Sequence, residues 1–151
     1  MQYYYLTSGI GFGSFSLSSF DSALISSGIG NYNLVKISSI LPPYCEERKS
    51  LDLFEGSILH TAFATLTSNE VGSVISAAVG VAIPQNNDNV GVIMEYSGFC
   101  SKIDTLNQVT MMLEESMSNR GFLIKEMKTV SNEVIVPNNR FASVVAALSL
   151  W

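Results

Sequence analysis

Two adjacent serines, Ser38 and Ser39, are the residues of this sequence best suited to change their own chemistry. If the hydroxyl of Ser39 attacks the carbonyl of Ser38, the amide becomes an ester whose alcohol oxygen lies β to the Ser39 nitrogen. Elimination from this ester leaves a carboxylate on Ser38 and a dehydroalanine at position 39. Hydrolytic loss of ammonia then produces a pyruvoyl ketone at a new N-terminus. The pair could therefore provide the chain with a covalent cofactor.

Two adjacent serines alone indicate little, because the chain has further serine pairs at 18–19 and 26–27 and such a pair can simply be a polar step in a strand. The residues around Ser38 and Ser39 distinguish this pair from the others. Several segments, in order along nearly the whole chain, resemble the pyruvoyl-dependent arginine decarboxylases. These segments are 20–24 (FDSAL), 27–34 (SGIGNYNL), 37–43 (ISSILPP), 67–68 (TS), 75–78 (ISAA), 81–84 (VAIP), 93–96 (IMEY) and 146–148 (AAL).

The resemblance implies a fold, a cofactor and a reaction. The fold is an αββα sandwich that assembles as a trimer, and the single domain 1–151 cleaves itself into chains 1–38 and 39–151. The pyruvoyl group derived from Ser39 forms a Schiff base with the substrate amine and acts as an electron sink for decarboxylation. The implied reaction converts L-arginine into agmatine and carbon dioxide. Whether trimers pair into hexamers stays open.

Glu95 is expected to act with Ser39 as a catalytic residue. It lies among apolar and aromatic neighbours in the segment 91–96. Burial there favours the neutral carboxyl, which could donate a proton to the substrate α-carbon after carbon dioxide leaves. The alternative is an outward-facing strand glutamate. The resemblance, which matches Glu95 to the general acid of the family, favours the catalytic role.

Asp21 is the only acidic residue among the first 45, which suits a carboxylate directed at a cation. A guanidinium can meet a carboxylate with two parallel hydrogen bonds, whereas helix-surface solubility is the competing explanation. The resemblance favours substrate binding by Asp21. It also implies that the Asn33 amide polarises the Ser38 carbonyl or stabilises an oxyanion there. The remaining expected substrate-binding residues are Leu17, Gly30, Tyr32, Ser38 and Ile40.

Other functions remain open. Segment 9–16 has no acidic residue or proline, and the charged loop after Pro43 carries no clear family pattern. Because loops near a pocket tune selectivity, lysine, ornithine or another amino acid is an alternative substrate. An unprocessed trimeric relative that binds a basic metabolite without catalysis is an alternative from a different class.

Composition limits the possible partners. With 151 residues the chain can form one domain with a buried core. Hydrophobic residues make up 47% and charged residues 14%, so part of the surface is expected to lie in a subunit interface. The net charge of −5 and the scattered basic residues argue against nucleic-acid binding and suit a small cationic ligand.

The expected location is the cytoplasm. No apolar run approaches the roughly 18 residues that span a membrane, and the first residues lack the basic region of a secretion signal. Cys45 and Cys100 are expected to be free thiols. Because His60 is the single histidine and no Cys/His cluster exists, no metal site is predicted.

The elements that position these residues follow from hydrophobic periodicity. Helices are predicted over 16–27 and from the Ser101 cap to Arg120, and residues 8–13 and 44–56 are predicted as loops. Short turns between many of the strands favour antiparallel pairing, with the helices covering the sheets, in an α+β fold. The predicted strands are 3–7, 34–41, 57–68, 71–83, 90–96, one or two within 122–136, and 140–150.

Overall fold

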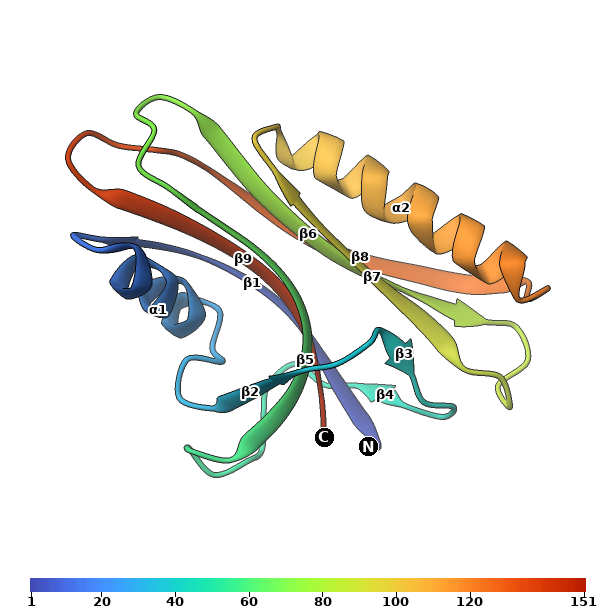
Figure 1. The fold of residues 1–151 in the computed structure, drawn as a ribbon. Coiled ribbons are helices and arrows are strands. Elements are labelled where there is room, and N and C mark those ends of the chain that lie inside the picture. Colours follow the sequence, from blue (N-terminus) through green and yellow to red (C-terminus); the bar gives the residue numbers. More distant parts are fainter.

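Two helices cover the outer faces of two stacked β-sheets in the computed structural model, which describes residues 1–151 (Figure 1). In chain order the elements are β1 (Tyr3–Gly13), α1 (Ser16–Ser26), β2 (Asn33–Lys36), β3 (Ile40–Leu41), β4 (Glu46–Glu47), β5 (Ile58–Ser68), β6 (Val74–Pro84), β7 (Gly91–Gly98), α2 (Lys102–Asn119), β8 (Ile124–Ile135) and β9 (Phe141–Leu150).

The strand order is β2-β5-β9-β1-β4 in the five-stranded sheet and β3-β7-β6-β8 in the four-stranded sheet. The long strands all pair antiparallel, and only the short edge strands β2 and β4 pair parallel with their neighbours. Helix α1 packs on the first sheet and α2 on the second (Figure 1). The predicted αββα sandwich of mainly antiparallel sheets is therefore confirmed.

The main core lies between the sheets, where alternate residues of each strand face the opposite layer. Alanines such as Ala77 of β6 and Ala146 of β9 alternate in this interface with larger apolar side chains, among them Ile75, Ile93 and Leu148. Burying such apolar surface is the main favourable term in folding. Separate apolar clusters join α1 to the first sheet and α2 to the second.

The glycine-rich segment 8–13 is part of strand β1, so the predicted flexible loop is wrong. Gly9, Gly11 and Gly13 alternate along β1 and face α1. A Cβ on Gly11 would lie 2.2 Å from the nitrogen of Ala23, and a Cβ on Gly9 would lie 2.3 Å from the oxygen of the same residue. These glycines are therefore required because the helix backbone approaches the strand too closely for any side chain.

Helix α2 begins as its sequence predicts. Ser101 accepts a hydrogen bond from the Asp104 backbone N–H, while the Asp104 side chain accepts one from the Ser101 backbone N–H. This capping box satisfies N–H groups that have no partner within the helix. Val109, Leu113 and Met117 form its buried stripe, as expected, and pack on the second sheet.

The predicted single strand over 34–41 is also wrong, because the chain divides there into β2 and β3. Strand β2 pairs with β5 in the first sheet, and β3 pairs with β7 in the second. The three residues between them cross from one sheet to the other (Figure 1). The predicted loop 44–56 contains the short strand β4, whereas segment 122–136 forms one strand, β8.

Candidate active site

The serine pair lies in the segment that crosses between the two sheets. Ser38 is exposed and Ser39 is partly buried. The Ser39 carbonyl accepts a hydrogen bond of 2.9 Å from the Ile93 backbone N–H, which fixes the start of β3 against β7. Ser39 has a φ of 56°, in the left-handed region that residues with a Cβ rarely adopt. This conformation costs roughly 1–2 kcal/mol, so the surrounding contacts must hold the residue there.

The Ser39 hydroxyl meets the Glu95 carboxylate at the crossover. Ser39 Oγ donates a hydrogen bond of 3.1 Å to Glu95 Oε2. Glu95 lies on β7 one pleat beyond Ile93, and only 18% of its side chain is exposed. The distance is within the range at which a carboxylate can accept a proton from a hydroxyl. The structure thus brings together two residues that are 56 positions apart in the sequence.

Lys36 is a third member of this group, and the sequence interpretation missed it. Its Nζ lies 3.8 Å from Glu95 Oε1 and donates a hydrogen bond of 3.2 Å to the Phe63 carbonyl oxygen. It also lies 5.0 Å from the centroid of the Phe63 ring. The only sign in the sequence that Lys36 belongs to the site is its place three positions before Ser39. Its contact with Glu95 of β7 depends on how the two sheets stack.

Asn33 lies at the opposite end of β2 from the crossover. Its side-chain amide donates a hydrogen bond of 2.6 Å to the Gly56 carbonyl oxygen, and its backbone N–H donates to Ser57. These contacts attach the start of β2 to the loop before β5. The expected role of Asn33 at the Ser38 carbonyl stays a prediction.

Gly30 and Tyr32 line a small hollow of about 130 Å³ between the end of α1 and the loop before β5. A Cβ on Gly30 would lie 2.7 Å from the nitrogen of Ile25, so this position requires glycine. The Tyr32 hydroxyl donates to the Leu53 carbonyl, and the Asn31 amide donates to Glu55. The acidic group of this hollow, Glu55, was not among the expected site residues.

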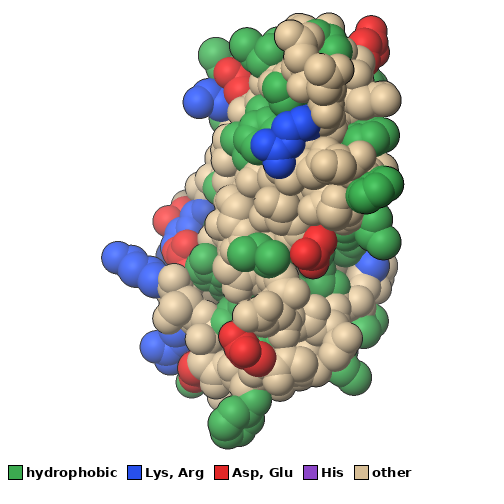
Figure 2. All heavy atoms as spheres, turned by 90° about the vertical axis from the view of Figure 1, so that its left-hand side faces the viewer, with side chains coloured by type: hydrophobic (Ala, Val, Ile, Leu, Met, Phe, Trp, Pro, Cys, Tyr) green, Lys and Arg blue, Asp and Glu red, His purple; other side chains and the backbone are tan.

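Asp21 and Leu17 lie on the exposed face of α1, and Figure 1 shows this helix apart from the crossover between β2 and β3. Together with Phe15, which precedes the helix, and Phe20 of α1 they line a surface hollow of about 630 Å³. Leu17 is 76% exposed. Figure 2 shows this side of the molecule, where hydrophobic side chains reach the surface among a few charged groups. Asp21 therefore lies on an apolar surface that one chain leaves uncovered.

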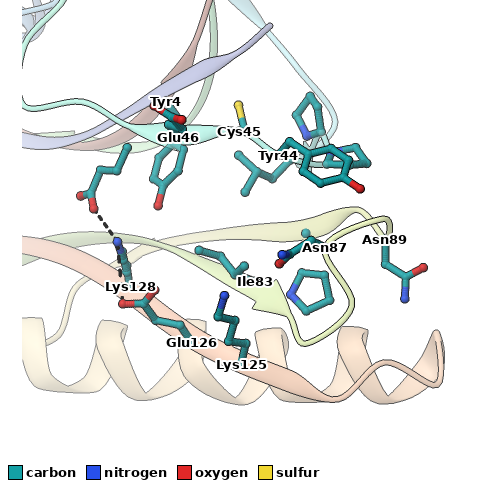
Figure 3. Close-up of a pocket in the computed structure, with 16 residues that line it drawn as sticks. Tyr4, Tyr44, Cys45, Glu46, Ile83, Asn87, Asn89, Lys125, Glu126 and Lys128 are labelled. Atoms are coloured by element: carbon teal, nitrogen blue, oxygen red, sulfur yellow. Dashed lines mark hydrogen bonds and ion pairs between the residues drawn. The ribbon is translucent and has the colours of Figure 1, made fainter.

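A separate cleft of about 430 Å³ opens between the sheets near the start of β1 (Figure 3). The Tyr4 side chain and Lys128 approach each other there from opposite sheets. Lys128 forms ion pairs with Glu47 at 2.6 Å and with Glu126 at 3.7 Å. Burial raises the pKa of Tyr4, and the hydrogen bond to Glu47 raises the pKa of Lys128. None of these residues was expected in the site.

No three His, Cys, Asp or Glu side chains gather closely enough to hold a metal ion. Neither helix has both the length and the apolar character needed to cross a membrane.

The αββα sandwich is the fold that the resemblance to the pyruvoyl-dependent arginine decarboxylases implied. The family model of pyruvoyl-dependent arginine decarboxylase matches residues 3–151. The chain therefore belongs to the pyruvoyl-dependent arginine decarboxylase family, and members of this family carry a covalently bound pyruvoyl group.

Individual relatives agree with this assignment. The chain is 41% identical over 138 residues to the pyruvoyl-dependent arginine decarboxylase of Pyrococcus abyssi, covering 90% of this chain and 87% of that protein. It is 41% identical over 140 residues to the corresponding protein of Thermococcus sibiricus, covering 91% and 88%. With that of Methanocaldococcus jannaschii the identity is 37% over 146 residues, covering 97% and 87%.

Proposed function

We propose that this protein cleaves itself between Ser38 and Ser39 and then converts L-arginine into agmatine and carbon dioxide. The observation that carries the proposal is the hydrogen bond from Ser39 Oγ to Glu95 Oε2 at the crossover. The names of the related proteins support arginine as the substrate.

The contacts around Ser39 support a route for self-cleavage. As Ser39 Oγ bonds to the Ser38 carbonyl carbon, its proton passes to Glu95 Oε2, the acceptor at 3.1 Å. The carbon–nitrogen bond then breaks, and the Ser39 nitrogen takes up a proton. Loss of the Ser39 α-proton expels the Ser38 carboxylate, and water converts the resulting dehydroalanine into the pyruvoyl group with release of ammonia.

The residues around position 39 fit the later reaction as well. The pyruvoyl group supplies an electron sink that ordinary side chains lack. Glu95 stays beside position 39, where its carboxyl can return a proton to the substrate α-carbon after carbon dioxide leaves. Ser38 and Ile40, which lie on either side of Ser39 and are both exposed, are proposed to contact the substrate.

Substrate recognition is proposed to require more than one copy of the chain. Asp21 and Leu17 lie on the uncovered face of α1, and this helix lies apart from the crossover between β2 and β3 of the same chain (Figure 1). In the proposed homotrimer, Asp21 of a neighbouring copy would bind the guanidinium with two parallel hydrogen bonds. Gly30, Tyr32 and Asn33 would complete the pocket. The exposed apolar side chains of α1 support burial in such an interface.

The cytosol is the proposed compartment. Cys45 and Cys100 form no disulfide, as expected in a reducing environment.

Intact mass spectrometry tests the cleavage. Scaling 16.4 kDa by chain length gives products of about 4.1 and 12.3 kDa. The Ser39→Ala variant has no hydroxyl to attack Ser38, so it should remain whole. A single uncut mass for the native protein after prolonged incubation would instead support an unprocessed binding protein.

A substrate panel tests the specificity. The cleaved protein should release carbon dioxide from arginine at a higher kcat/KM than from lysine or ornithine. Equal or better activity on lysine or ornithine would overturn arginine as the substrate and leave the decarboxylase proposal intact.

A further inference from the structure

Lys36 of β2, in the five-stranded sheet, contacts the carboxylate of Glu95 on β7, in the four-stranded sheet. One oxygen of Glu95 accepts the Ser39 hydrogen bond at 3.1 Å, and the other lies 3.8 Å from Lys36 Nζ. The two oxygens of one carboxylate are thus occupied separately, by a hydroxyl and by a cation. No other cationic side chain lies within 4.0 Å of Glu95, from α2, β5 or any other element.

The Lys36 ammonium is held in place although 59% of its side chain is exposed. Pairing of β2 with β5 ends at Lys36 and Thr61, so the Phe63 carbonyl further along β5 has no β2 residue opposite it. Lys36 Nζ donates to this carbonyl at 3.2 Å and lies 5.0 Å from the centroid of the Phe63 ring. A lysine with two anchors loses less freedom on pairing than a free surface lysine.

We propose that Lys36 is a positioning residue for self-cleavage, which holds one oxygen of the Glu95 carboxylate so that the other faces the Ser39 hydroxyl and can accept its proton. The inference rests on the proposed self-cleavage. The carboxylate can take the proton only if a free lone pair points at Ser39 Oγ as this oxygen bonds to the Ser38 carbonyl carbon. The Lys36 ammonium beside one oxygen directs the lone pair of the other oxygen toward Ser39.

The size of the effect follows from the geometry. A charge pair near a protein surface is weakened by solvent screening, and 59% of the Lys36 side chain is exposed. We therefore expect Lys36→Met to slow cleavage by about 5- to 10-fold rather than to abolish it. Lys36→Arg keeps the charge and the donors, so it should restore most of the rate.

The experiment measures the conversion of freshly purified full-length chain to the two products by intact mass, for the native protein, Lys36→Met and Lys36→Arg. Lys49→Met is the matched control, since Lys49 is an exposed lysine without an ion pair. It should cleave at the native rate.

Salt provides a second measurement that does not depend on a mutation. Raising ionic strength screens the exposed side of the ion pair, so native cleavage should slow toward the Lys36→Met rate while the variant changes little. A slower Lys36→Met whose salt response matches that of the native chain, or a Lys36→Arg no faster than Lys36→Met, would indicate a structural role and overturn the proposal. A native rate for Lys36→Met would overturn it as well. Failure of the native chain to cleave at all would instead overturn the proposed function.

Discussion

Lys128 of β8 and Glu47 of β4 form a 2.6 Å ion pair that joins the two sheets across the cleft of Figure 3. The pair lies beside the buried Tyr4 of β1. Two proton-binding groups with raised pKa values therefore lie at the same contact between the sheets.

Stability should fall at alkaline pH because of this contact. Tyr4 and Lys128 have folded-state pKa values above their ordinary 10.0 and 10.5, so the folded protein binds these protons more tightly than the unfolded chain. Their contribution to the free energy of unfolding is complete below about pH 10 and is lost as the pH rises through the folded-state pKa values. Urea unfolding between about pH 8 and pH 11 measures this loss.

Two lysines of the same strand provide the comparison. Lys128→Met should cost up to about 1 kcal/mol at pH 8 relative to the native protein, and this difference should shrink toward pH 11. Lys125 also lines the cleft but forms no ion pair, so the effect of Lys125→Met should not depend on pH in this way. If the free energy of unfolding of both variants changed with pH in the same way, the Lys128–Glu47 pair would not be the cause of the loss.

Glu95→Gln should impair two steps. The amide keeps the shape of the side chain but can neither accept the Ser39 proton nor donate one to the substrate, so both cleavage and turnover should slow. On the cleaved fraction, kcat should fall by roughly 10² to 10⁴. Quantifying the cleaved chain by mass before each assay separates the two effects. If cleaved Glu95→Gln turned over substrate as fast as the native protein, another group would have to protonate the substrate.

Asp21→Asn should separate recognition from processing. Self-cleavage should proceed normally because Asp21 lies apart from the crossover of its own chain, while arginine binding should weaken by about 2 to 5 kcal/mol as a charged pair is lost. Steady-state kinetics of the cleaved variant measure the loss. Glu114→Gln removes a comparable exposed helix carboxylate from α2 and should leave arginine kinetics unchanged. Unchanged kinetics in Asp21→Asn would place the guanidinium elsewhere.

Gly11→Ala should destabilise the fold by separating α1 from β1. The added Cβ would lie 2.2 Å from the Ala23 nitrogen and 2.3 Å from the Ser19 oxygen, and neither backbone atom can move without shifting the helix. We expect a loss of about 1–3 kcal/mol or more in urea unfolding. Gly98→Ala is the control, because its Cβ would meet no backbone atom but only side-chain atoms, the Cys100 sulfur at 3.3 Å and the Tyr96 ring at 3.4 Å. Equal losses would contradict the close-packing explanation.

Local sequence patterns predicted the helices because their determinants are local. The apolar spacing of α1 and the Ser101 cap of α2 act within a few turns, so the boundaries agree with the structure to within one or two residues. Glycine in β1 misled the prediction, since its conformational freedom normally indicates a loop. Here glycine is needed because α1 packs too closely on β1 for any Cβ, and the sequence of this segment does not reveal that the helix packs there.

The serine pair, the apolar setting of Glu95 and the isolated carboxylate of Asp21 could all be recognised from the sequence alone, because they depend on residue types and near neighbours. The structure decided that Ser39 meets Glu95, that Lys36 reaches the same carboxylate, and that Asp21 lies apart from them. The alternating segment 34–41 predicts a single strand, yet its ends pair with different sheets. Such partners are chosen by the stacking of the sheets, which brings distant parts of the chain together and which local sequence does not encode.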